Sequence, residues 1–335
     1  MKISLVFALI IAPILGLSQT ASNAYAIGVD GVKAIEAGEF NEGIKLLKKA
    51  WSLEPGEYDY PFELGRAHFL DGQEKKAEKF LFPLQYHANV QPDLYVLLAD
   101  CYKKIDETKK SPDVTRKKEF DALRYGIQKL PESGVLYLEM GKRKLELEEN
   151  VDALSVFETG IKNAPNFTEN YFWAAKLMKA SRNYLWAWIY AELYLNISDN
   201  VEMNRTAARI VSESMNKVLS ENWMMEPEKM DQGLKFLLSG DCVPSEAGLE
   251  RILQFRICLM NEWKNTKFPM SVILERTEQL KKQGFLEAYL GSVVLEADKE
   301  AFLTWLASNG KRYEAYRKWR FYNPMMITEP VIRVQ

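Results

Sequence analysis

Apolar and small residues recur at a constant spacing through the first part of the chain, and polar residues fill the positions between them. Gly65 lies 34 residues after Gly31, and Ala77 lies 34 residues after Gly43. A fixed period of roughly 20–50 residues is typical of stacked repeats. Within each period the apolar positions are three and four residues apart on both sides of a turn such as Gly38, which predicts an amphipathic helical hairpin.

The period divides this part of the chain into five predicted hairpin units. Gly141 lies 42 residues after Ala99, eight more than one period, so the third unit contains an insertion. The polar, proline-containing segment 106–118 is predicted to hold the extra residues at a hairpin turn, where they disturb no packed face. The predicted units are 27–57, 58–91, 92–133 (with the insertion), 134–167 and 168–201.

Beyond residue 201 the constant spacing is lost, although the helical pattern continues. Residues 202–322 are predicted to form a degenerate helical repeat region, in which Asn309-Gly310 separates two short helices at 299–308 and 311–321. The segment 323–335 has two prolines and no helical period, so it is predicted to be an extended tail. No convincing run of residues alternates as a strand does, and the predicted fold class is all-α.

The fourth unit carries the signature of a known repeat. It contains Met140-Gly141, then Ala153-x3-Phe157 and a late Pro165. This order resembles the tetratricopeptide repeat, whose pattern is W-x2-L-G-x2-Y, then A-x3-F and a late Pro, although no unit has the first Trp. The resemblance covers residues 27–201. It implies a right-handed α-solenoid of antiparallel helix pairs, with a concave groove that holds peptides or partner proteins.

The resemblance also implies which side chains face that groove, since three positions of each first helix do so in the family. Carried over by register, the predicted partner-binding residues are Phe62, Arg66, Phe69, Lys103, Lys142, Phe172, Lys176 and Lys179. The same register adds Val96, Asp100, Leu138 and Leu145. Five basic residues against one acid favour an acidic protein segment held by charge-assisted hydrogen bonds. In the alternative interpretation the lysines are merely solvated on helix faces.

The first 26 residues have the features of a signal peptide. Lys2 gives a basic start, residues 3–17 are apolar, and Ala24-Tyr25-Ala26 has the small-x-small pattern of a signal-peptidase site. The apolar run is shorter than the roughly 20 residues that a membrane-spanning helix needs, which argues against the alternative of an uncleaved anchor. The sequence therefore predicts a periplasmic or secreted protein, cleaved near Ala26.

Composition and motifs exclude several classes of function. The formal charge of −2 gives no field for nucleic acid, and membrane contact is expected only through a partner complex. The chain has two histidines and three cysteines, and its sequence contains no metal, cofactor or nucleophile motif, so no cofactor, no metal and no enzyme activity are expected. Cys242 and Cys258 could form a disulfide across a short loop; three reduced thiols in the core are the equal alternative.

These observations predict a non-enzymatic exported scaffold or assembly subunit that binds a protein segment. Two alternatives belong to other classes. One is a self-associating structural subunit, a homo-oligomer formed through the C-terminal helices. The other is a glycan-binding or hydrolytic protein that uses the aromatic-rich C-terminal half, with rings that could stack on sugars at Trp186, Trp188, Trp263 and Trp305.

Overall fold

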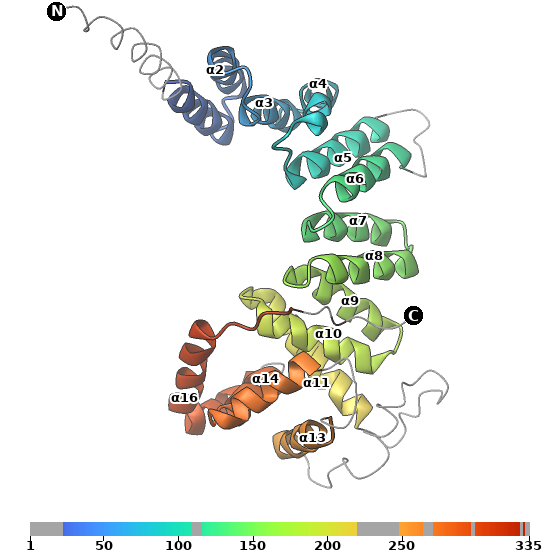
Figure 1. Cartoon of the computed structure of the whole chain (residues 1–335), viewed down its shortest axis with the longest axis vertical. Coiled ribbons are helices and arrows are strands. Elements are labelled where there is room, and N and C mark those ends of the chain that lie inside the picture. Colours follow the sequence, from blue (N-terminus) through green and yellow to red (C-terminus); the bar gives the residue numbers. More distant parts are fainter. Residues whose placement is uncertain are drawn as a thin grey trace, which may run out of the picture. The chain divides into compact units, whose positions relative to one another are not determined.

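The computed structural model describes residues 23–108, 116–219, 248–263, 271–295, 299–328 and 331 (Figure 1). Every regular element in these ranges is helical, so the fold is all-α, as the hydrophobic pattern predicts. The chain divides into two compact units, Met1–Pro131 and Glu132–Gln335. Residues 1–22 of the predicted signal peptide, most of the predicted insertion and residues 220–247 of the predicted degenerate helical region lie outside the described residues.

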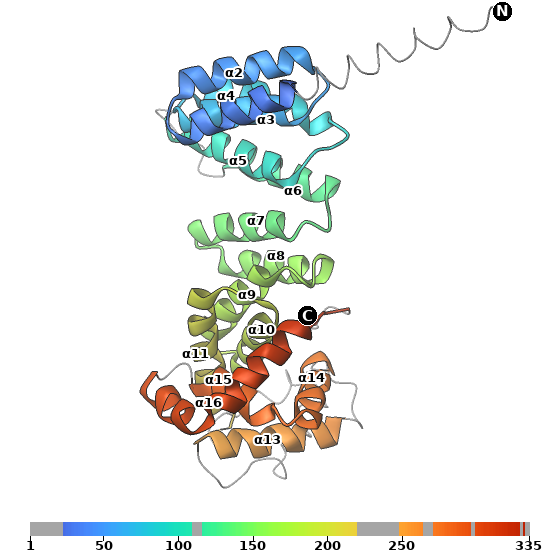
Figure 2. The ribbon, with the colours of Figure 1, turned by 90° about the vertical axis from the view of Figure 1, so that its left-hand side faces the viewer.

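In the first unit, successive helices pack against one another as hairpins (Figure 2). A helix over residues 23–36 comes first, and Ile35 from it packs with Leu47 in a common core. The 3-10 helix η1 (Phe82–Tyr86) extends α4, since Pro83 has no amide hydrogen for an α-helical bond. The remaining helices are α2 (Phe40–Leu53), α3 (Asp59–Leu70), α4 (Glu74–Leu81), α5 (Pro92–Glu107) and α6 (Lys117–Lys129).

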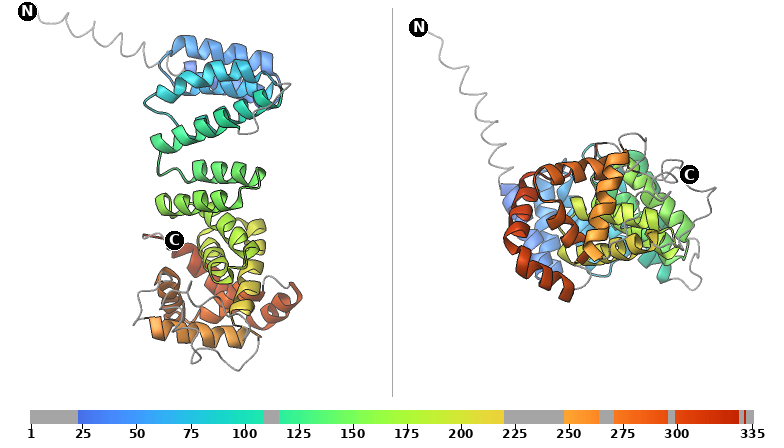
Figure 3. Two further views of the ribbon diagram at one scale, coloured as in Figure 1. Left: turned by 90° about the vertical axis from the view of Figure 1, so that its right-hand side faces the viewer. Right: turned by 90° about the horizontal axis from the view of Figure 1, so that it is seen from below.

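Within its described residues, the second unit continues the hairpins and adds four C-terminal helices (Figure 3). Its core is centred on α10, most of which is buried, including Trp188, Tyr190 and Tyr194. The hairpin helices are α7 (Gly134–Glu146), α8 (Asn150–Asn163), α9 (Thr168–Ala180) and α10 (Tyr184–Ile197), followed by α11 (Val201–Val218). The C-terminal helices are α13 (Gly248–Trp263), α14 (Ser271–Lys282), α15 (Leu286–Leu295) and α16 (Lys299–Tyr322).

The turns inside the hairpins share one backbone geometry. In four hairpin turns among the described residues, one residue is left-handed, and these residues are 34 positions apart within each unit: Gly38 (φ 81°), Gly72 (69°), Glu148 (60°) and Arg182 (61°). The next amide then donates to the carbonyl five residues back, as from Glu39 to Ala34 and from Asn183 to Met178, both at 2.8 Å. This is the Schellman pattern that ends helices. The turn, like the helix faces, repeats with the period of the sequence.

The same turn recurs between α14 and α15. Gly284 has φ 72°, and the amide of Phe285 donates to the carbonyl of Leu280 at 2.8 Å. Gly284 lies 102 residues after Arg182, which is three times the repeat length. The C-terminal region, where the apolar pattern loses its period, therefore contains a hairpin closed in the same way as the repeats.

Small residues at the signature positions allow the paired helices to approach closely. A Cβ atom on Gly141 would lie 2.3 Å from Cε1 of Phe157, and one on Gly65 would lie 2.4 Å from Cδ2 of Leu81. Any larger residue at either position would displace a fully buried side chain of the opposite helix.

The predicted break at Asn309-Gly310 is wrong, because both residues lie inside the single helix α16. A glycine within a helix costs only about 1 kcal/mol relative to alanine, which tertiary packing readily offsets. Here Trp305 and Tyr313, on either side of the glycine, pack with ring centroids 6.0 Å apart. The side chain of Asn309 donates to the carbonyl of Trp305 at 3.0 Å and so remains compatible with the helix.

The residues that follow α16 are not helical and return to the repeats. Asn166, in the turn between α8 and α9, donates to the carbonyl of Ile327 at 3.1 Å and accepts from its amide at 3.0 Å. Met325, Ile327 and Val331 are buried in the core of the second unit. The described part of the predicted extended tail is therefore held by one bidentate amide and three apolar anchors.

The cysteines differ in state. Cys101 is a free, fully buried thiol on α5, and burial raises its pKa to about 12. Cys258 takes part in a disulfide bond, whereas Cys242, its predicted partner, lies outside the described residues. Among the helices that the structure describes, none has the length and apolar character needed to cross a membrane.

Candidate partner-binding cavity

The first unit contains a cavity of about 830 Å³ along its first helices. It is lined by the helix over residues 23–36, by the segment from Glu54 into α3, by Leu47 of α2 and by the start of α5 with the preceding Gln91. The lining residues are Tyr25, Gly28, Val29, Val32, Lys33, Glu36, Leu47, Glu54, Glu57, Tyr58, Asp59, Tyr60, Phe62, Glu63, Gln91 and Asp93.

Aromatic rings form part of the wall. Tyr58 is 5% exposed and stacks on the half-buried Phe62, with ring centroids 5.7 Å apart and planes 16° from parallel. Burial raises the pKa of Tyr58 to about 12, so the phenol is neutral at physiological pH. Tyr60 donates from its hydroxyl to Glu54 at 3.0 Å; burial and then this carboxylate raise the pKa of Tyr60 to about 12. The rings are thus fixed by packing and hydrogen bonding.

The polar lining of the cavity is strongly acidic. Among the described lining residues the only base is Lys33, whose ammonium group lies 3.5 Å from Asp30, a residue outside the lining. Two of the six lining carboxylates have partners in the fold: Glu54 accepts from Tyr60, and Glu63 pairs with Arg66 at 2.6 Å. Across the described residues, no ion pair is formed by the other four, Glu36, Glu57, Asp59 and Asp93.

Only one of the predicted partner-binding residues of the first unit lines this cavity. Phe62 contributes its ring, whereas the guanidinium of Arg66 is engaged by Glu63. Phe69 on α3 and Lys103 on α5 are half-buried and lie outside the lining. The structure therefore brings Phe62 together with acidic residues that the register of the repeat did not single out.

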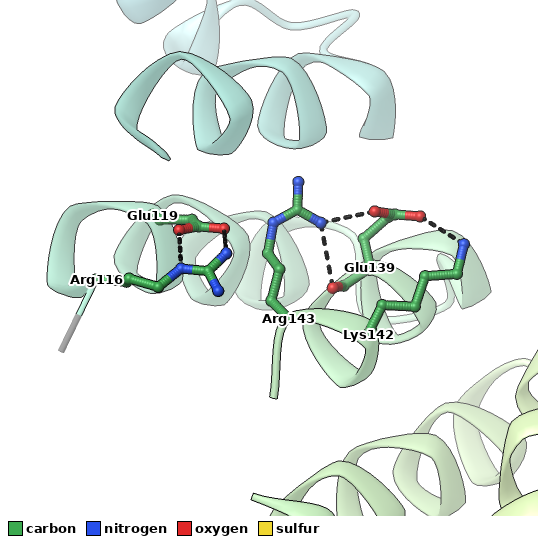
Figure 4. Close-up of polar contacts among 5 residues, drawn as sticks. All are labelled: Arg116, Glu119, Glu139, Lys142 and Arg143. Carbon is green, nitrogen blue, oxygen red and sulfur yellow. Dashed lines mark hydrogen bonds and ion pairs between the residues drawn. The ribbon is translucent and has the colours of Figure 1, made fainter. Parts of the chain in front are cut away.

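In the second unit the predicted lysines are engaged within the fold. Lys142 pairs with Glu139 at 3.0 Å, and Arg143 shares that carboxylate at 2.6 Å (Figure 4). Burial opposes ionisation of Glu139, but hydrogen bonds from Arg143 and Lys142 lower its pKa. Lys179 pairs with Glu213.

The two remaining predicted residues of this unit, Lys176 and Phe172, contact aromatic rings of the same unit. Lys176 lies over the ring of Trp173, 4.2 Å from its centroid. Phe172 is 6% exposed and packs against Tyr194 at 5.3 Å, so its ring lies in the core and offers a partner little surface.

The count of five basic residues against one acid therefore overstates the positive charge of the predicted strip. The neutralising acids lie one turn away on the same helix or on a neighbouring helix. Glu63 and Glu139 each lie three residues before the base that they pair with, a spacing that brings side chains together on a helix. That spacing is visible in the sequence and could have identified both pairs. Arg116 and Glu119, in the first unit, repeat it (Figure 4).

The tryptophans proposed for sugar stacking belong largely to the core. Trp188 is 1% exposed and donates from Nε1 to Glu192 at 2.5 Å, so no sugar can reach its ring. Trp186 and Trp305 are half-buried and pack against the same core, Trp186 at 5.3 Å from Tyr190. The side chain of Trp263 lies outside the described residues.

His68 has a packing role. It is 7% exposed and stacks on Phe80 with centroids 5.4 Å apart, and burial lowers its pKa. The described residues contain no group of three or more His, Cys, Asp or Glu side chains placed to hold a metal ion.

The second unit also contains a buried charge cluster, whose members the repeat pattern of the sequence does not bring together. Glu192 on α10 and Arg256 on α13 are both 0% exposed and pair at 2.6 Å. Tyr289 on α15 also donates to Glu192, and Asn196 donates to the Tyr289 hydroxyl at 2.8 Å. Burial and the Glu192 charge raise the pKa of Tyr289 well above its usual value. The network connects helices α10, α13 and α15. Because all its members are buried, it presents no surface to a substrate.

Successive hairpins with a common turn and a constant period define a helical-repeat protein. The sequence profile of the family described as "Tetratricopeptide repeat" matches residues 34–101, which include most of the cavity. Residues 34–101 therefore belong to the tetratricopeptide-repeat family.

Several solved structures are similar to the chain. MamA is 20% identical, with a TM-score of 0.38 over 53% of this chain and 96% of that one. TTC0263, a thermophilic TPR protein in Thermus thermophilus, is 15% identical, with a TM-score of 0.41 over 56% and 98%. PilF of Pseudomonas aeruginosa is 15% identical, with a TM-score of 0.44 over 60% and 85%. No curated protein matches the sequence.

Proposed function

We propose that this chain is a non-enzymatic, exported interaction scaffold or assembly subunit that binds a segment of a partner protein. Tetratricopeptide-repeat proteins generally mediate protein–protein interactions or assembly. The observation that carries the proposal is the cavity along the first helices, where the accessible ring of Phe62 lies beside carboxylates without ion partners. Rigid aromatic anchors beside polar groups are typical of protein-binding sites.

Photo-crosslinking within the intact chain tests this proposal. A photoreactive phenylalanine at Phe62 is expected to capture a partner in cells. The same residue at Leu70, which is 51% exposed on the same helix and outside the cavity lining, provides the matched control. Equal capture from both positions, or no capture from Phe62, would contradict a binding site in the cavity.

Export is part of the proposal and rests on the sequence features of residues 1–26. Cleavage after Ala26 would shorten the helix over residues 23–36 by its first turn and remove Tyr25 from the edge of the cavity. Mass spectrometry of the mature protein is expected to find Ile27 at the N-terminus. An intact Met1 on the functional protein would contradict it.

Self-association is the second candidate. Phe321 and Tyr322, at the end of α16, and Met326 are 79%, 70% and 63% exposed. Neighbouring exposed apolar side chains mark contact surfaces. Light scattering is expected to show a mass that rises with concentration, and the double change Phe321→Ser and Tyr322→Ser to abolish that rise. A monomeric mass for the unaltered chain at every concentration would eliminate this candidate.

A further inference from the structure

We propose that the cavity of the first unit binds a cationic segment, in which lysine or arginine side chains flank an apolar residue. The inference rests on the proposed function and specifies the chemistry of the partner. The charge of the proposed partner is therefore opposite to the negative charge that the repeat register predicts from the sequence. Three properties of the cavity support it: its charge, its rings and its size.

The charge of the lining favours positive ligands. Six carboxylates face one ammonium group, and that group lies near Asp30. Clefts lined by charges of one sign concentrate the field and raise the local concentration of opposite charges. Of the predicted basic residues, Arg66 neutralises one lining carboxylate, Glu63, and Lys103 lies outside the lining, so five carboxylates still face Lys33.

The rings of the wall suit the same ligand. Phe62 retains an accessible face while its other side is stacked on Tyr58. A guanidinium or ammonium group gains from an aromatic face, and the aliphatic stem of either side chain covers apolar surface. The second unit contains the same contact within the fold, with Lys176 over Trp173 at 4.2 Å.

The arrangement of the carboxylates favours a peptide over a metal ion. They come from three separate segments, residues 23–36, residues 54–63 and the start of α5. Throughout the described residues, no three acidic, His or Cys side chains converge as a metal site would require. Separated negative charges instead match positive charges distributed along an extended chain. A volume of about 830 Å³ accommodates several side chains of such a segment but no folded domain.

Fluorescence anisotropy with three synthetic peptides of equal length tests the inference. Each peptide carries leucine at every third position, and the positions between are lysine, glutamine or glutamate. The lysine peptide is expected to bind about tenfold more tightly than the glutamine peptide, with an affinity that falls as salt rises. The glutamate peptide is expected not to bind.

Charge variants then locate the binding. The change Glu36→Lys with Glu57→Lys reverses two unpaired rim charges, and neither residue caps the start of a helix. This double change is expected to lower the affinity for the lysine peptide about tenfold or more. The matched control is Glu275→Lys with Glu314→Lys, which makes the same change of net charge at exposed sites in α14 and α16 and is expected to leave affinity unchanged. Circular dichroism verifies that both variants are folded, and Glu36→Gln with Glu57→Gln is expected to give an intermediate loss.

The outcomes separate the two proposals. Tight binding of the glutamine or glutamate peptide that is lost on Phe62→Ala would overturn the cationic assignment and preserve the binding function of the cavity. An equal loss in the rim variant and in its control would overturn the location. Absence of binding by all three peptides, together with absence of crosslinks from Phe62, would overturn both proposals.

Discussion

At the level of single residues, the hairpin turns show how the repeat tolerates variation. The first two turns use glycine in the left-handed conformation, whereas the later two place Glu148 and Arg182 there. A residue with a Cβ atom is strained in this region by about 1–2 kcal/mol. The hydrogen-bonding pattern is nevertheless the same, so the surrounding hairpins impose the conformation on these two residues.

The strain leads to a prediction in both directions. Gly72→Ala is expected to destabilise the protein by about 1 kcal/mol, because alanine must adopt φ near 69°. Arg182→Gly is expected to stabilise it by up to about 1 kcal/mol, since the strain is relieved at some cost in chain entropy. Urea denaturation of the intact chain measures both changes. Gly56→Ala is the control, because a Cβ atom there meets nothing within 4 Å and φ is not positive, so it should not destabilise.

Single residues also explain why the chemistry predicted for the groove differs from that of the cavity lining. The family register includes Phe62, which lines the cavity, but it counts bases without their neighbours on the helix, and Arg66 and Lys142 each have a glutamate three positions earlier. The acids of the cavity could not be grouped from the sequence. Glu36, Glu57 and Asp93 belong to three segments that only the packing of hairpins brings together.

At the level of elements, the 3.6-residue pattern and the 34-residue period were sufficient to predict the hairpins. They failed where packing outweighs local preference, as in α16, which continues through Gly310 because aromatic rings pack on both sides of it. Neither pattern could reveal the contact between Glu192 and Arg256, since the residues are 64 positions apart and belong to regions of different periodicity.

The buried pair gives a second prediction. Arg256→Met leaves Glu192 charged and buried without its main partner, so it is expected to destabilise the second unit by about 3–5 kcal/mol. The double change Glu192→Met with Arg256→Met removes both charges and is expected to cost clearly less. Thermal unfolding of the three proteins measures the difference. If the double variant were less stable than Arg256→Met, the destabilisation by the single change could not come from the unpaired charge of Glu192.

The tail gives a third prediction. Asn166→Ala removes both hydrogen bonds to Ile327 and is expected to release the segment from residue 324 onward. Limited proteolysis should then cleave this segment faster, while the repeats remain intact. Asn163→Ala is the control, since Asn163 lies on α8 and bonds to Tyr137 rather than to the tail. Equal cleavage rates in the Asn166 variant and the unaltered chain would show that Met325, Ile327 and Val331 hold the tail without the amide.

At the level of the whole molecule, both units are built from helical hairpins, but the polar side chains of those hairpins have different contacts in each unit. The first unit retains a cavity along its first helices, whereas in the second unit Lys142, Lys176 and Lys179 are satisfied within the fold. We therefore propose that the partner segment binds to the first unit, where the lining carboxylates supply the complementary charge.

Hydrogen–deuterium exchange of the intact chain, with and without the lysine peptide, tests that assignment most directly. Binding in the cavity is expected to slow exchange in residues 23–36, in residues 54–63 and at the start of α5, and to leave α7 and α9 unchanged. Protection of α7 and α9 without protection of residues 54–63 would contradict the account and return the binding site to the lysine strip that the sequence predicts.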